Sequence, residues 1–114
     1  MMREDDNSNK NRRQFSRYSP RVYYRVGKSQ SLRQRVSDIS IGGVRIYSDT
    51  RWDIGEEVAL ELFFPDGDSG EVKARVVWIK ELAPDTGASY DVGLEFVDLP
   101  LAVTEWLREA LEIE

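Results

Sequence analysis

The chain has 114 residues, and its 16 Lys and Arg against 21 Asp and Glu give a formal net charge of −5. It contains no Cys and no His, which excludes disulfides, thiolate metal sites and catalysis that relies on a cysteine or histidine side chain. The length suits one domain with one hydrophobic core; because there is neither a signal-peptide pattern nor an apolar run near the ~20 residues that span a bilayer, we expect a cytoplasmic protein without membrane insertion.

The N-terminal part of the chain is polar and basic. Residues 1–11 contain no apolar anchor, so we expect a flexible N-terminal segment. Residues 12–20 follow without hydrophobic periodicity, and only Phe15 and Tyr18 could pin them to a folded body. We therefore predict a domain over residues 12–114 that begins with an arm, mobile when empty and ordered when a ligand is bound.

Charge is distributed unevenly along the chain. Residues 1–35 contain ten Lys and Arg against three acids, whereas residues 36–114 contain six against eighteen. A basic front end on an acidic body favours an anionic ligand that is captured locally. The pattern argues less well for a long nucleic acid as partner, because the acidic body would repel the neighbouring phosphates.

Six short segments either alternate between apolar and polar residues or are rich in β-branched and aromatic residues, which is typical of β-strands. They cover residues 22–26, 32–39, 43–48, 57–64, 71–82 and 90–97. Turns rich in Gly, Pro, Asp and Ser separate most of them. This spacing favours a mainly β fold, a six-stranded antiparallel barrel that is closed or nearly closed.

The fifth of these segments is the longest, and its alternation places Val72, Ala74, Val76 and Trp78 on the inner side. Trp78 could instead be an exposed platform on which a base stacks. In the same way Trp52, in the loop before the fourth segment, could mark a partner surface. The sequence leaves both alternatives open beside simple packing.

The period of the apolar residues changes after Pro100, which is well placed to start a helix. From there an apolar residue recurs every three to four positions, as on one face of a helix. These residues are Val103, Trp106, Leu107, Ala110 and Leu111. We predict a C-terminal helix over about 101–112 that closes one end of the barrel or packs on its side.

Two small motifs carry the candidate binding chemistry. Arg13 and Arg17 stand four residues apart, and a guanidinium offers a planar fork of donors that fits phosphate oxygens and the O6/N7 edge of guanine. Asp38, Ser40 and Gly43 form an Asp-x-Ser-x-x-Gly pattern. Its carboxylate can accept from the N1–H and N2–H2 donors of guanine, and its glycine permits close approach to the backbone. Together these residue types suit a ligand that carries both phosphate and guanine.

Each motif taken alone has a simpler interpretation. An arginine pair near a terminus is most often a solvated basic run. An Asp-x-Ser pattern before glycine is most often a hairpin turn in which the Asp and Ser side chains cap free backbone N–H groups. The joint occurrence of the two motifs, on either side of one short β-rich segment, favours a single binding site.

The two motifs in this order and at this spacing resemble the two-part signature of PilZ domains, bacterial receptors for cyclic di-GMP. The matching residues are Arg12, Arg13, Arg17, Asp38, Ser40 and Gly43. Further along, residues 76–78 and 91–96 resemble the later strands of the same family. The resemblance covers roughly residues 12–111 and implies a stand-alone PilZ-like barrel that binds cyclic di-GMP.

The resemblance also implies a role for each motif. Arg13 and Arg17 would clamp the phosphates and guanine edges, while Asp38 and Ser40 would take polar edges of a guanine. Gly43 would let the turn pass close to the ligand. In the family an arginine at the position of Arg12 accompanies an intercalated ligand dimer, so we expect two ligands per chain. Ordering of the arm would then be read by an effector protein acting in trans.

Other classes of function have less support. No pair of a nucleophile and a base stands out, so we expect no enzymatic activity, no catalytic residues, no metal and no catalytic cofactor. The alternatives are a small β-barrel that binds RNA or single-stranded DNA, and a PilZ-like adaptor without ligand binding. We expect a monomer or a weak homodimer, with Trp106 or Trp52 as the candidate contact.

Overall fold

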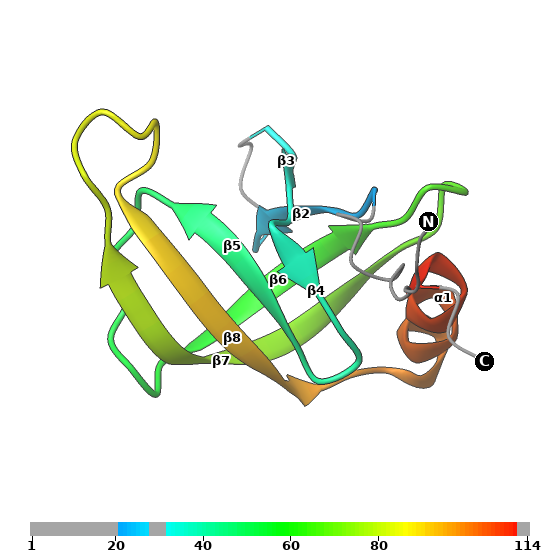
Figure 1. Cartoon of the computed structure of the whole chain (residues 1–114). Helices are drawn as coiled ribbons and strands as arrows, with labels where there is room; N and C mark the ends of the chain where they lie inside the picture. Colours follow the sequence, from blue (N-terminus) through cyan, green and yellow to red (C-terminus); the bar gives the residue numbers. More distant parts are fainter. Residues whose placement is uncertain (1–20, 28–31, 112–114) are drawn as a thin grey trace, which may run out of the picture.

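The structure, a computed structural model, describes residues 21–27 and 32–111. Its elements in chain order are β2 (Tyr23–Val26), β3 (Gln34–Arg35), β4 (Asp38–Ile39), β5 (Gly43–Ser48), β6 (Glu57–Phe63), β7 (Ser69–Glu81), β8 (Tyr90–Asp98) and α1 (Leu101–Leu111). Figure 1 shows the strands wrapped around a common interior, with the helix at one end. The predicted flexible segment and the arm over residues 12–20 lie outside the described residues.

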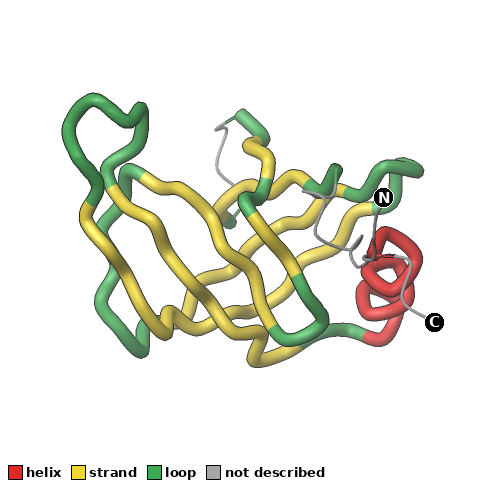
Figure 2. The backbone as a smooth tube through the Cα atoms, viewed as in Figure 1, coloured by secondary structure: helices red, strands yellow, loops and turns green. Residues whose placement is uncertain are grey.

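All neighbouring strands are antiparallel, in the order β3-β2-β6-β7-β8-β5-β4. The sheet curls into a half-barrel, as Figure 2 shows. The mainly β barrel-like fold predicted from the sequence is therefore confirmed. Among the described residues it has seven strands rather than six, because the segment predicted as one strand over residues 32–39 forms two short ones.

This split has a physical reason. β3 and β4 are consecutive in the chain but lie at opposite ends of the strand order. Between them, the Val36 N–H donates to the carbonyl of Val22 (3.0 Å), and the Ser37 N–H donates to the carbonyl of Arg45 (2.8 Å). One segment thus pairs first with β2 and then with β5, which connects the two edges of the curved sheet, and it must bend between the two partners.

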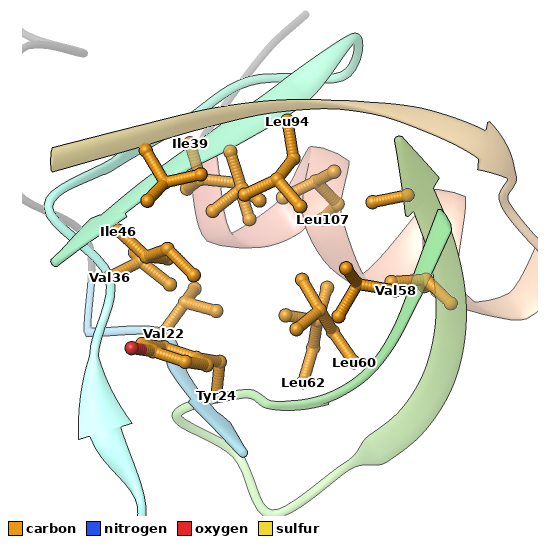
Figure 3. Packing of buried hydrophobic residues seen from close by; sticks show 14 of the residues in the cluster. Val22, Tyr24, Val36, Ile39, Ile46, Val58, Leu60, Leu62, Leu94 and Leu107 are labelled. Carbon is orange, nitrogen blue, oxygen red and sulfur yellow. The ribbon is translucent and has the colours of Figure 1, made fainter. Parts of the chain in front are cut away.

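The interior is filled by the apolar faces of the strands, as the alternation predicted. Val58, Leu60, Leu62 and Phe64 are all buried. Figure 3 shows side chains from opposite walls, among them Leu60, Leu94 and Ile46, directed into the same space. Burial of these faces supplies the main stabilisation of the fold.

The helix closes one end of this interior. Its buried residues are Val103, Leu107 and Leu111, as predicted, and the Trp106 ring lies 5.9 Å from the ring of Phe64. A Cβ added at Gly70 would come within 2.7 Å of the Val103 side chain, so the helix packs closely on the start of β7. Within the described residues no helix has the length and apolarity to cross a bilayer.

A β-bulge in β7 changes the direction of its side chains. Val76 faces Leu94 across the strand pair, but Trp78, not Val77, faces Gly93. The extra residue reverses the alternation. Trp78 therefore lies on the outer surface, 40 % exposed, and its predicted place on the inner side is wrong.

The structure decides between packing and exposure for Trp52 and Trp78, the two tryptophans for which the sequence left both open. Trp52, which could have marked a partner surface, is 8 % exposed and belongs to the hydrophobic core. A loop residue can be core when the loop crosses an end of a barrel, which local periodicity does not reveal. Trp78 is the tryptophan that faces outward.

Burial also constrains Tyr24, whose hydroxyl donates to the carbonyl of Tyr47 (2.7 Å) and lies 3.0 Å from Gln34 Oε1. This burial, with a further contribution from the Asp49 carboxylate, raises the pKa of Tyr24 to about 12. The folded protein thus holds the phenol proton more tightly than the unfolded chain, in which tyrosine titrates near pH 10. The associated stability is complete below pH 10 and is lost as the pH rises through 12.

The core assignment predicts losses of very different size at two neighbouring positions of β7. Val76 is 1 % exposed and Val77 is 42 % exposed. Val76→Asp should lower the free energy of unfolding by about 4 kcal/mol or more, because it puts a charge without a partner into the core. Val77→Asp should cost about 1 kcal/mol. Urea unfolding of both variants measures this, and equal losses would contradict the inward orientation of Val76.

The raised pKa of Tyr24 makes the stability of the fold depend on pH. Tyr24→Phe removes the titrating phenol, at a cost of about 1 kcal/mol at neutral pH for the lost hydrogen bond. Between pH 10 and 12 the wild type should lose stability relative to this variant, by up to about 2 kcal/mol. Urea unfolding of both proteins from pH 8 to 12 tests this. Parallel stability curves across the whole range would show that Tyr24 does not titrate differently in the folded state.

Candidate functional site

The turn from β4 to β5 holds three of the predicted site residues. The Ser40 N–H donates to the carbonyl of Gly43 (2.9 Å), and the Gly42 N–H donates to Ser40 Oγ (3.2 Å). The Ile39 N–H donates to Asp38 Oδ1 (2.9 Å). These local bonds are those of a capped hairpin turn. They also fix Asp38 and Ser40, both exposed, in defined directions at the surface.

Gly43 has a structural role in this turn. A Cβ at this position would overlap the carbonyl oxygen of Leu94 and come within 3.2 Å of the Cα of Glu95. The Phe96 N–H also donates to the carbonyl of Gly42 (2.9 Å). The backbone of the turn therefore lies directly against β8, and any side chain at Gly43 would push the two apart.

Four residues on the outer face form one row across four adjacent strands. Asp38 on β4 faces Arg45 on β5, Arg45 faces Gly93 on β8, and Gly93 faces Trp78 on β7. Figure 1 shows these strands side by side in the order β4, β5, β8, β7. A hollow of about 270 Å³ lies along the row, and Ser40 and Gly43 also line it.

The centre of the row depends on a missing side chain. A Cβ at Gly93 would overlap Nε1 and Cε2 of the Trp78 indole, so the pyrrole edge of the ring occupies the space above this glycine. The β7 bulge turns Trp78 to this side, and Gly93 leaves room for it. An aromatic surface and a carboxylate are thus brought to the same hollow from distant parts of the chain.

Arg45 is held in the row by a second carboxylate. Its Nε donates to Asp91 Oδ1 (2.9 Å) and its Nη2 donates to Asp91 Oδ2 (2.6 Å). These bonds raise the pKa of Arg45 above its usual range. The guanidinium carbon lies over the Trp78 ring, 5.8 Å from its centroid. Arg45 therefore links the buried Asp91 to the aromatic surface.

The structure describes only three of the six predicted site residues. It brings Asp38, Ser40 and Gly43 together at one hollow. The three arginines of the other motif, Arg12, Arg13 and Arg17, lie outside the described residues.

Sequence reasoning missed Arg45, Asp91 and Gly93 and placed Trp78 on the wrong face. The available signal was Asp91, an acid near the start of a strand and next to the apolar residue Val92. Nothing in the sequence pairs it with Arg45.

Comparisons with known proteins identify a family and a shared fold. The family model of the PilZ domain matches residues 11–112. A solved structure from Bacillus subtilis, described as an inhibitor of motility (MotI/DgrA), is similar with a TM-score of 0.68 at 20 % identity. The match covers 90 % of this chain and 51 % of that protein, so the chain spans about half its length. At this identity the likeness establishes a shared fold. No curated protein matches the chain.

The contact between Gly93 and Trp78 can be tested by a double-mutant cycle. Gly93→Ala should lower the free energy of unfolding by about 1–3 kcal/mol, because the new methyl group collides with the indole. In a Trp78→Ala background the same change should cost less by at least about 1 kcal/mol. Chemical denaturation of the four proteins measures the coupling, and additive effects would show that the indole does not cover Gly93.

Proposed function

This chain belongs to the PilZ domain family, and on that premise we propose that it is a cytoplasmic receptor for cyclic di-GMP, the ligand associated with the family. PilZ domains are binding and adaptor domains rather than enzymes. The observation that carries the proposal is the row from Asp38 to Trp78. It places a carboxylate and an aromatic ring at one surface hollow, beside Ser40 of the signature turn.

The described half of the site suits a guanine base. The Asp38 carboxylate can accept from the N1–H and N2–H2 donors of its Watson–Crick edge. The Ser40 hydroxyl can donate to or accept from a further polar atom. The exposed indole of Trp78 offers a stacking surface, and stacking on an aromatic side chain is worth about 1–3 kcal/mol per base.

The rest of the ligand requires the arm. A hollow of about 270 Å³ is smaller than the ~300–1,000 Å³ that encloses a drug-sized ligand. It can take one base but not a whole cyclic dinucleotide. We assign the phosphates and the remaining guanine edges to Arg13 and Arg17, whose guanidinium forks fit both. Arg12 would support a second, intercalated ligand.

Binding would order residues ~8–20 against the barrel. Ordering of such a segment costs ~2–5 kcal/mol, and charge-assisted hydrogen bonds of ~1.5–3 kcal/mol each offset this cost. The output is a change of shape at the arm that an effector protein recognises in trans.

The arginines of the arm provide the most direct mutational test. Arg13→Ala or Arg17→Ala should weaken the binding of cyclic di-GMP about 10- to 150-fold, from the loss of one charge-assisted contact. The melting temperature of the ligand-free protein should not change, because in this proposal the arm contributes nothing to the core. Arg51→Ala, in the loop between β5 and β6 and away from the row, is the matched control and should bind as the wild type does. A lower melting temperature for Arg17→Ala would contradict this division between arm and barrel.

The function itself is tested by isothermal titration calorimetry of the wild-type chain with cyclic di-GMP, GTP and a short RNA. Micromolar or tighter binding of cyclic di-GMP supports the receptor, and a stoichiometry near two supports the role of Arg12. A stoichiometry of one removes the intercalated pair. Binding of RNA without binding of cyclic di-GMP would replace the receptor by a nucleic-acid module. No binding of any of them would leave an adaptor.

A further inference from the structure

We propose that the ion pair of Arg45 and Asp91 is a positioning device for this site: Asp91 holds the guanidinium against the Trp78 indole, which fixes the ring beside the hollow. Arg45 and Asp91 are positioning residues, since they act through Trp78. The identity of the ligand rests on the proposed function, but the orientation of the indole can be measured without any ligand.

The first step is the burial of Asp91. Asp91 is only 4 % exposed, although its side chain points to the outer face of the sheet. A carboxylate that has lost its water needs a charged partner and hydrogen bonds to both oxygens. Arg45 supplies one nitrogen to each oxygen. Such a bidentate pair has one favoured geometry, so it fixes where the guanidinium lies.

The second step is the contrast between the ion pair of Arg45 and Asp91 and the ion pairs of Arg75 on the same outer face. Arg75 reaches Glu95 at 3.0 Å and Glu57 at 3.7 Å, and all three side chains are substantially exposed. Exposed pairs of this kind contribute little and hold their side chains loosely. The Arg45 pair combines a buried carboxylate with two short, directed bonds. Its geometry serves to orient a group as well as to balance charge.

The third step is the position of Trp78. Gly93 leaves room for the pyrrole edge but offers no side chain to hold it. The guanidinium of Arg45, over the ring at 5.8 Å from its centroid, provides the cation–π contact. With the guanidinium fixed by Asp91, one orientation of the indole is favoured before a ligand arrives.

A ring that is already oriented binds a base more tightly, because less side-chain entropy is lost on binding. The loss avoided for one side chain corresponds to about 2- to 12-fold in affinity. Trp78 therefore acts as a prepared stacking surface, and the buried pair behind it determines how well it is prepared.

The test removes both charges together, as Arg45→Gln with Asp91→Asn, so that no buried charge is left without its partner. Acrylamide quenching of Trp78 is measured in the ligand-free protein, as the difference between each protein and the same protein carrying Trp78→Phe. We expect the quenching constant to rise about twofold in the double variant. Arg75→Gln, which removes both ion pairs of Arg75 from the neighbouring row, is the control and should leave the quenching constant unchanged.

Arg45→Lys is the second variant, useful if the double variant does not fold. It keeps the charge but not the planar fork, and it should raise the quenching constant in the same direction by a smaller amount. Unchanged quenching of Trp78 in a folded variant, confirmed by thermal unfolding, would overturn the inference whatever the ligand is.

Affinity for cyclic di-GMP separates this inference from the proposed function. The double variant should bind about 2- to 12-fold more weakly than the wild type, and Arg75→Gln should bind within twofold of it. A mobile indole with unchanged affinity would overturn the role of the pair at the ligand site. If the wild type itself does not bind cyclic di-GMP, the proposed function fails, and the quenching result still decides whether the pair positions Trp78.

Discussion

The structure depends on one short segment that pairs with both edges of a curved sheet. Gln34–Arg35 pairs with β2, and three residues later Asp38–Ile39 pairs with β5. This joins the edges and encloses the core. The same segment delivers Asp38 to the outer face beside Arg45. The joining of the two edges and the placement of the Asp38 carboxylate are thus consequences of one set of backbone hydrogen bonds.

A single extra residue in β7 has a comparable effect. Without the bulge at Val77, Trp78 would continue the inner alternation of Val72, Ala74 and Val76. With it, the indole lies outside, above the bare backbone of Gly93. The bulge therefore moves Trp78 from the core side of the sheet to the outer face, where it lies beside the hollow. Bulges beside binding sites commonly redirect a side chain in this way.

In the proposed receptor, rigid strands of the barrel and an arm that becomes ordered on binding have different roles. Asp38 and Trp78 are carried by paired strands, and strands hold a site more accurately than loops do. In the proposed receptor the arginines of the arm would supply charge, and their ordering would supply the signal. A rigid half that recognises a base and a second half that orders around the phosphates would couple recognition to a change of shape.

The sequence by itself determined the local structure. The strands over residues 43–48, 57–64 and 90–97 and the helix lie within one residue of their predicted ends, because alternation and helical periodicity are properties of neighbouring residues. Asp38, Ser40 and Gly43 meet because one turn contains them all. Only the tertiary structure decided what depends on strands distant in the chain: the outward face of Trp78, the burial of Trp52, and the pairing of Arg45 with Asp91. Register across a sheet is set by which strands pair, and a local pattern carries no information about its partner.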